Sequence, residues 1–76
     1  MIKVGQIYKE KELPEWRKNE EDMFIVTNVC YSSVTIIYPD GKCDYVVDSW
    51  IKEDCDLIAE YQTWQEAVNS EYFKND

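Results

Sequence analysis

The most constraining feature of this sequence is a turn signal, Pro-Asp-Gly-Lys at residues 39–42, between two runs rich in β-forming residues. Proline presets φ at the first turn position, and Asp-Gly supplies residues that tolerate positive φ. The flanking runs, residues 33–38 (SVTIIY) and 43–47 (CDYVV), are therefore predicted to be antiparallel strands. Only two residues separate the first of them from another β-rich run, residues 23–30 (MFIVTNVC), which predicts a second hairpin.

Two further strands are predicted at the ends of this region, residues 2–9 and residues 56–61. Between the fourth and the fifth strand, residues 48–51 favour a short helical turn with Asp48 or Ser49 as its cap. The predicted sheet therefore has five short strands and one helical corner.

A capping signal near the end of the chain predicts a helix. The sequence Thr-Trp-Gln-Glu matches the capping box, with Thr63 as N-cap and Glu66 reaching back to the Thr63 amide. Trp64 and Val68 share one side of this helix at the i, i+4 spacing and are expected to pack it against the sheet.

The number and length of these elements define the fold class. The 76 residues are expected to form one domain, with the β part at 1–62, the helix at 63–70 and a fraying tail at 71–76. Short strands leave exposed sheet edges, and closing the sheet removes them. We therefore predict a mainly β domain, either a small SH3-like barrel or a strongly bent five-stranded antiparallel sheet with the helix packed across it.

Three cysteines, Cys30, Cys43 and Cys55, bear on compartment and metal binding. An odd number, without a signal peptide, argues against a secreted disulfide framework. The chain is therefore expected to be cytoplasmic, with reduced thiols and no cofactor. Zinc sites usually combine close C-x-x-C pairs with histidine, and this chain has no histidine. A zinc ion held by the three thiolates and one carboxylate (Asp44, Asp54 or Asp56) is the alternative.

Charge and residue types exclude several functional classes. Sixteen acidic residues against eight basic ones give a net charge of −8, the wrong sign for gripping nucleic acid directly. No apolar run approaches the roughly 18–20 residues that span a membrane. Histidine, the commonest general acid–base, is absent, and the two glycines form no phosphate-binding loop. Because so small a chain has little room for a substrate pocket, we expect a protein that is not an enzyme.

The acidic residues are concentrated in the C-terminal half. Residues 1–39 carry a net charge of −1 and residues 40–76 a net charge of −7. Asp44 and Asp48 are expected on one strand face, where alternate residues lie about 6.6 Å apart, a spacing similar to that of successive phosphates. Such a row would fit a basic nucleic-acid groove on another protein, whereas the simpler interpretation is a solubilising face. The predicted contact set is Asp40, Asp44, Asp48, Glu53, Asp54, Asp56 and Glu60.

Aromatic residues are expected mainly in the interior. Most belong to predicted strands or helices and are assigned to packing: Phe24, Tyr38, Tyr45, Trp50 and Trp64. Trp16 differs because charged residues surround it in a predicted loop. It either folds over the end of the sheet or acts as an exposed interface anchor, and we include it among the candidate partner-binding residues.

Three segments resemble a known group of proteins. The opening VGQIYK, the central YPDGK and above all the closing LIAEYQTWQEAVNS resemble small acidic accessory proteins of phages and prophages of low-GC Gram-positive bacteria. In that group a segment similar to AEYPTWQEAVNS ends the chain after a small β-barrel, and here Gln62 replaces the proline. The resemblance implies a phage accessory protein and transfers no catalytic residue. Such proteins are often inhibitors of host nucleic-acid machinery, the most concrete version being a type II anti-CRISPR protein that blocks Cas9.

Charge and resemblance together give the expected function. The protein is expected to inhibit a host protein by occupying its basic nucleic-acid groove with the acidic contact set, and Cas9 is the most concrete partner. The alternative is a phage adaptor with no inhibitory role, whose barrel recognises a peptide through aromatic contacts. Neither function involves direct binding of nucleic acid or of a membrane.

Overall fold

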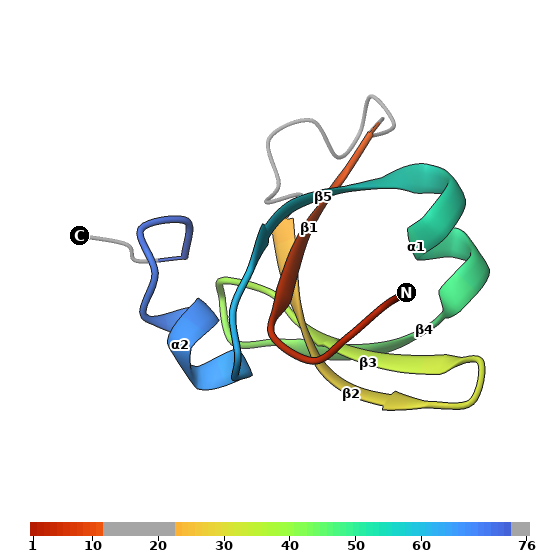
Figure 1. Cartoon of the computed structure of the whole chain (residues 1–76), viewed down its shortest axis with the longest axis horizontal. Helices are drawn as coiled ribbons and strands as arrows, with labels where there is room; N and C mark the ends of the chain where they lie inside the picture. The colour runs from red at the N-terminus through yellow and green to blue at the C-terminus, as the bar shows by residue number, and fades with distance from the viewer. Residues whose placement is uncertain (12–22, 74–76) are drawn as a thin grey trace.

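A five-stranded antiparallel sheet and two short helices make up the computed structural model, which describes residues 1–11 and 23–73 (Figure 1). The strands are β1 (Gln6–Glu10), β2 (Met23–Cys30), β3 (Ser33–Ile37), β4 (Cys43–Val47) and β5 (Cys55–Glu60). Helix α1 (Asp48–Asp54) joins β4 to β5, and helix α2 (Trp64–Val68) follows β5.

The strand order is β4-β3-β2-β1-β5, so β4 and β5 form the two edges of the sheet. No pairing joins these two edges among the described residues, and the sheet is strongly bent but not closed into a barrel (Figure 1). The prediction of a mainly β domain is confirmed, in its bent-sheet version. Helix α1 crosses from one edge strand to the other, and α2 lies at the opposite end of the molecule in Figure 1.

Hydrophobic residues are buried on both faces of the sheet. The inner face, defined as the face packed against Ile51 of α1, holds the larger cluster: Ile2, Tyr8, Phe24, Val26, Val34, Ile36, Ile51 and Cys55. The outer face, packed against α2, holds a second cluster: Ile7, Ile25, Ala67 and Phe73. Alternation along β1 explains this division, since Ile7 and Tyr8 must point to opposite faces.

The aromatic part of the inner cluster is centred on Phe24, which is fully buried. Its ring lies 5.6 Å from the ring of Trp50 and 6.1 Å from that of Tyr38, between centroids. Trp64 packs against the outer cluster. Four of the five aromatics that the sequence assigned to packing therefore do pack, and the exception, Tyr45, is 76% exposed.

The predicted turn at residues 39–42 is confirmed. Gly41 has a φ of +92°, and its amide donates to the Tyr38 carbonyl at 2.9 Å. The Asp40 carboxylate accepts from the Lys42 amide at 2.9 Å. This aspartate therefore stabilises the turn itself.

The first predicted strand begins later than expected, because Gly5 interrupts it with a φ of +94°. A side chain at this position would overlap the Tyr61 carbonyl, and the backbone of Gly5 accepts from the Tyr61 amide at 3.0 Å. The close approach of these two backbone segments explains why the chain turns before β1.

Helix α1 is longer than the predicted helical turn, and neither Asp48 nor Ser49 caps it. The N-cap is Val47, which offers no side-chain hydrogen bond. Instead, the Asp48 amide donates to the Ser32 carbonyl at 2.8 Å. A backbone carbonyl in the turn between β2 and β3 therefore accepts the hydrogen bond that a side-chain cap was predicted to accept.

The C-terminal helix is shorter than predicted and the segment after it is better packed. Thr63 is the N-cap, and its hydroxyl accepts from the Glu66 amide at 3.2 Å. The described structure gives no reciprocal bond from the Thr63 amide to the Glu66 side chain, so only half of the capping box forms. Phe73 is only 8% exposed and belongs to the outer cluster, so the predicted fraying does not begin at residue 71. Neither helix has the length and apolar composition to cross a bilayer, within the described ranges.

Candidate binding surface

The predicted contact set spreads over both edges of the sheet. Asp40 and Asp44 lie in the turn before β4 and in β4, whereas Asp56 and Glu60 lie in β5 at the other edge. The remaining three, Asp48, Glu53 and Asp54, lie in α1 between the two edges. The acids therefore form a band that follows β4, α1 and β5, not one straight row.

Asp44 and Asp48 do not share a strand face as predicted, because β4 ends at Val47 and Asp48 begins α1. The Asp48 carboxylate is half-buried and lies 3.6 Å from the Lys52 ammonium, one helical turn away. Asp44 is exposed, and its carboxylate accepts from the Tyr45 amide at 2.8 Å. The phosphate-like spacing expected on one strand is thus absent from this pair.

Nearby lysines partly neutralise two acids of the band. Asp40 lies 3.9 Å from Lys42, and Asp56 lies 3.9 Å from Lys11, in both cases between charged atoms. These pairs are exposed, and exposed ion pairs are worth at most about 1 kcal/mol.

Glu60 has a different role, since its carboxylate accepts from the buried Gln6 side chain at 2.7 Å. Gln6 is 3% exposed, and its side-chain oxygen accepts from the Tyr8 hydroxyl at 2.8 Å. Burial, and secondarily the charge of Glu60, raise the pKa of Tyr8 above its ordinary value. Glu60 is therefore part of the hydrogen bonding that holds β5 and β1 together.

Glu53 and Asp54 are exposed at the carboxyl end of α1. Within residues 1–11 and 23–73, their side chains form no hydrogen bond or ion pair. The carboxyl end of a helix carries partial negative charge, so two carboxylates there are unfavourable and a nearby cation is favourable. Lys11 already serves the backbone of this helix end, because its ammonium donates to the Glu53 carbonyl at 3.4 Å and its amide donates to the Asp54 carbonyl at 2.9 Å. The two side-chain carboxylates stay exposed beside it.

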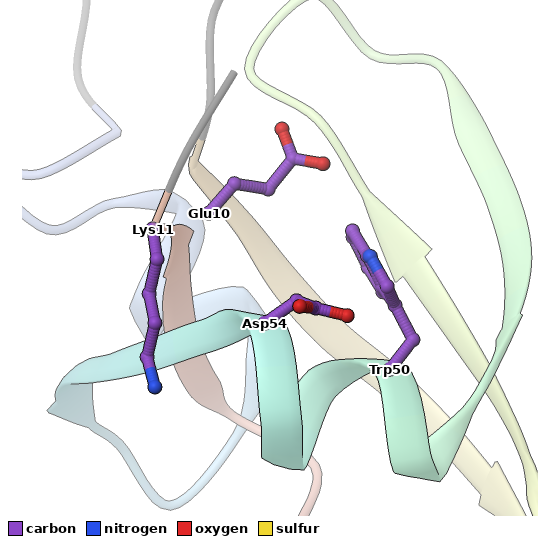
Figure 2. Close-up of a pocket in the computed structure, with 4 residues that line it drawn as sticks. All are labelled: Glu10, Lys11, Trp50 and Asp54. Carbon is purple, nitrogen blue, oxygen red and sulfur yellow. The ribbon is translucent and has the colours of Figure 1, made fainter. Parts of the chain in front are cut away.

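A pocket of about 410 Å³ lies beside this helix end and is lined by Glu10, Lys11, Trp50 and Asp54. Figure 2 shows Glu10 and Asp54 pointing toward the space beside the Trp50 indole, while Lys11 points away from it. Negative charge around the pocket also affects Cys55, which burial and then Glu10, Asp54 and Asp56 shift to a pKa of about 12. Sequence reasoning did not identify Glu10 or Trp50 as surface-forming residues, because β1 and α1 meet only in the folded chain.

The three cysteines do not converge. Cys30 and Cys43 are exposed and pair with residues at opposite ends of β3, whereas Cys55 is buried in the inner cluster. In the part of the chain that the structure describes, no three metal-ligating side chains come together. The alternative zinc site built on all three thiolates is therefore wrong for this fold. Trp16, the other residue singled out, lies outside the described residues.

Comparison with protein-family models, with curated proteins and with solved structures gave no match.

Proposed function

We propose that this protein is a non-enzymatic inhibitor that occupies a basic, nucleic-acid-binding surface of another protein. The observation that carries the proposal is the pair of exposed carboxylates, Glu53 and Asp54, whose side chains bond no cation within residues 1–11 and 23–73. A lysine or arginine of a partner would pair with them. A type II anti-CRISPR protein that blocks Cas9 in the bacterial cytoplasm is the most concrete version of this proposal.

The charge of the surrounding segment supports the same proposal. Residues 40–56 contain six acids and two lysines, a net charge of −4 on one continuous stretch of β4, α1 and the start of β5. Strong single-sign charge accelerates the approach of an oppositely charged partner and makes the complex sensitive to salt. The acids at the α2 end, Glu66 and Glu71, lie outside this stretch and provide a comparison set.

The test is a DNA-cleavage assay with a Cas9–guide RNA complex from a low-GC Gram-positive host. Wild-type protein should inhibit cleavage, and the inhibition should weaken steeply as salt is raised. Asp44→Lys with Asp54→Lys should raise the half-inhibitory concentration at least tenfold. The control, Glu66→Lys with Glu71→Lys, changes the net charge equally and should raise it less than twofold.

Two results would contradict the proposal. If the two double variants lose inhibition equally, net charge determines inhibition and the position of the acids on β4 and α1 does not. No inhibition by saturating wild-type protein would exclude Cas9 as the target. Thermal melts of all variants verify that the substitutions leave the fold intact, as expected for exposed positions.

A further inference from the structure

The pocket beside the carboxyl end of α1 is built by two elements that are far apart in the sequence. Trp50 and Asp54 have the i, i+4 spacing and therefore share one side of α1. Glu10 lies on β1, on the same face as Tyr8 of the inner cluster, because alternate strand residues point the same way. Figure 2 shows that both carboxylates are turned toward the space beside the indole. The fold thus places two carboxylates and an aromatic ring around one pocket of about 410 Å³.

The Trp50 indole is an independent indication of what this pocket can bind. Its ring is stacked on Phe24, with the centroids 5.6 Å apart and the ring planes at 21°. Trp50 is only half-buried, however, and it still lines the pocket. The face of an indole ring is electrically negative, and among aromatic side chains tryptophan attracts cations most strongly. The ring and the two carboxylates therefore favour the same kind of ligand, a cation.

The two carboxylates differ in their exposure to solvent. Glu10 is only 8% exposed, whereas Asp54 is exposed. A cation that enters the pocket would interact more strongly with the buried carboxylate, because water screens charge less in the interior than at the surface. The exposed carboxylate of Asp54 would pair with the same cation from the side of α1.

Lys11 lines the same pocket, but its ammonium is directed elsewhere. Figure 2 shows its side chain pointing away from the space between Glu10, Asp54 and Trp50. The Lys11 ammonium donates to the Glu53 carbonyl at 3.4 Å and lies 3.9 Å from the Asp56 carboxylate. Lys11 therefore does not place its charge between the indole and the two carboxylates.

The shape and charge of the pocket distinguish between classes of cation. Metal ions of the calcium or magnesium type need more oxygen ligands than two carboxylates supply, and no cluster of three ligating side chains exists within residues 1–11 and 23–73. A guanidinium group is planar, stacks on aromatic rings and has five N–H donors for carboxylate oxygens. An ammonium group lacks the planar face. A flat indole beside two carboxylates thus matches a guanidinium group best.

We infer that this pocket binds a guanidinium group and that its occupant is one arginine side chain from the nucleic-acid-binding surface of the partner. Such surfaces use arginine to contact phosphates, so a competitor for them would meet exposed arginines. The inference rests on the proposed function and identifies a specific contact within it.

The first test measures binding of a free probe, N-acetyl-arginine amide, by NMR titration at constant ionic strength. The indole N–H signal of Trp50 and the amides of residues 9–11 and 50–55 should shift in a saturable manner, and those of α2 should not. N-acetyl-lysine amide, which carries the same charge, should bind more weakly. Shifts that do not saturate or that spread over the whole chain would overturn the inference, and equal affinity for the two probes would overturn the assignment to arginine.

The second test uses variants that change the charge equally inside and outside the pocket. Asp54→Asn should weaken arginine-probe binding about fivefold, the effect of losing one exposed ion pair. Asp56→Asn is the matched control, because Asp56 is two residues away, is also exposed and does not line the pocket. It should leave the affinity within about twofold. Trp50→Phe keeps an aromatic ring against Phe24 and should weaken binding about threefold. Equal effects of Asp54→Asn and Asp56→Asn would show that net charge, and not the pocket, attracts the probe.

The same variants in the Cas9 cleavage assay separate this inference from the proposed function. Asp54→Asn should raise the half-inhibitory concentration about fivefold, and Asp56→Asn should raise it less than twofold. Inhibition that Asp54→Asn and Trp50→Phe leave unchanged rejects the pocket as the arginine contact and leaves the proposed function standing. Probe binding that depends on Asp54, in a protein that does not inhibit Cas9, rejects the Cas9 proposal and leaves the guanidinium site standing.

Discussion

The side-chain amide of Gln6 donates to the carboxylate of Glu60 at 2.7 Å, joining a nearly inaccessible residue of β1 to an exposed one of β5. The Gln6 oxygen is also used, since it accepts from the Lys3 amide at 2.7 Å and from the Tyr8 hydroxyl at 2.8 Å. One buried amide therefore connects the N-terminal segment, the inner cluster and an edge strand. Glu60, one of the residues predicted to bind a partner, satisfies this amide.

Replacing Glu60 should accordingly reduce stability more than replacing a neighbouring acid. Glu60→Ala should lower the free energy of unfolding by about 1–2 kcal/mol, because it leaves the Gln6 donor without its charged acceptor. Glu60→Gln keeps an acceptor and should cost less. Asp56→Ala is the control on the same strand and should change stability by about 0.5 kcal/mol or less. Urea denaturation measures all three, and equal losses for Glu60→Ala and Asp56→Ala would refute the structural role of Glu60.

The two glycines allow backbone strain to be separated from steric overlap. Gly5 and Gly41 have nearly equal φ values of +94° and +92°, but only at Gly5 would a Cβ meet other atoms, those of Tyr61 and Thr63. Gly41→Ala should cost about 1 kcal/mol from the unfavourable φ. Gly5→Ala adds the overlap and should cost about 2 kcal/mol or more. Thermal melts give the ranking, and a Gly41→Ala variant as unstable as Gly5→Ala would contradict it.

The C-terminal helix should depend on packing more than on its cap. Five residues are far fewer than the roughly 12–15 that an isolated helix needs, so contacts of Trp64 with the outer cluster must stabilise α2. Because Trp64 is half-buried, Trp64→Ala should cost about 2–3 kcal/mol, below the range for a fully buried indole. Thr63→Ala removes one exposed hydrogen bond and should cost about 1 kcal/mol or less. If the melting temperature falls more for Thr63→Ala, the cap is the main determinant.

Local signals predicted the strands well. β2 and β4 begin and end at the predicted residues because β-branched residues, alternation and a strong turn signal agree there. The start of β1 was wrong since the need for Gly5 arises from its contact with Tyr61, more than fifty residues away. The cap of α1 was wrong for the same reason, because a distant carbonyl, that of Ser32, serves the first amide.

The candidate surface was harder to predict because it depends on strand order. A sequence shows where strands are, but it does not show that β4 is an edge strand and that β5 lies at the opposite edge. Tyr45 was therefore assigned to packing although it is exposed, and the acids of β4 and β5 were assigned to one set. The charge asymmetry between the two halves of the chain needed no such knowledge, which is why it could be recognised in advance.

The pH dependence of stability should report the burial of Cys55 and the acids around it. Its thiol is buried, and nearby Glu10, Asp54 and Asp56 add to the effect of burial, so its pKa rises to about 12. An unfolded cysteine ionises near pH 8.5–9, so between about pH 9 and 12 the folded chain holds a proton that the unfolded chain has lost. Stability from this group is therefore fully present below about pH 9 and is lost as the pH rises.

The free energy of unfolding of the wild type should consequently fall faster with pH than that of Cys55→Ala, by up to about 1.4 kcal/mol per pH unit above pH 9. Tyr8, whose pKa is also raised, is present in both proteins. Cys55 is the smallest of the three causes of the Tyr8 shift, after burial and Glu60, so the difference between the two slopes comes mainly from the thiol. Urea denaturation at half-unit steps from pH 7.5 to 10.5 measures these slopes. Parallel curves for the two proteins would show that the Cys55 thiol ionises alike in the folded and unfolded chains. In Asp54→Asn the extra slope should persist over this pH range, because burial is the largest cause of the shift and the carboxylates are secondary.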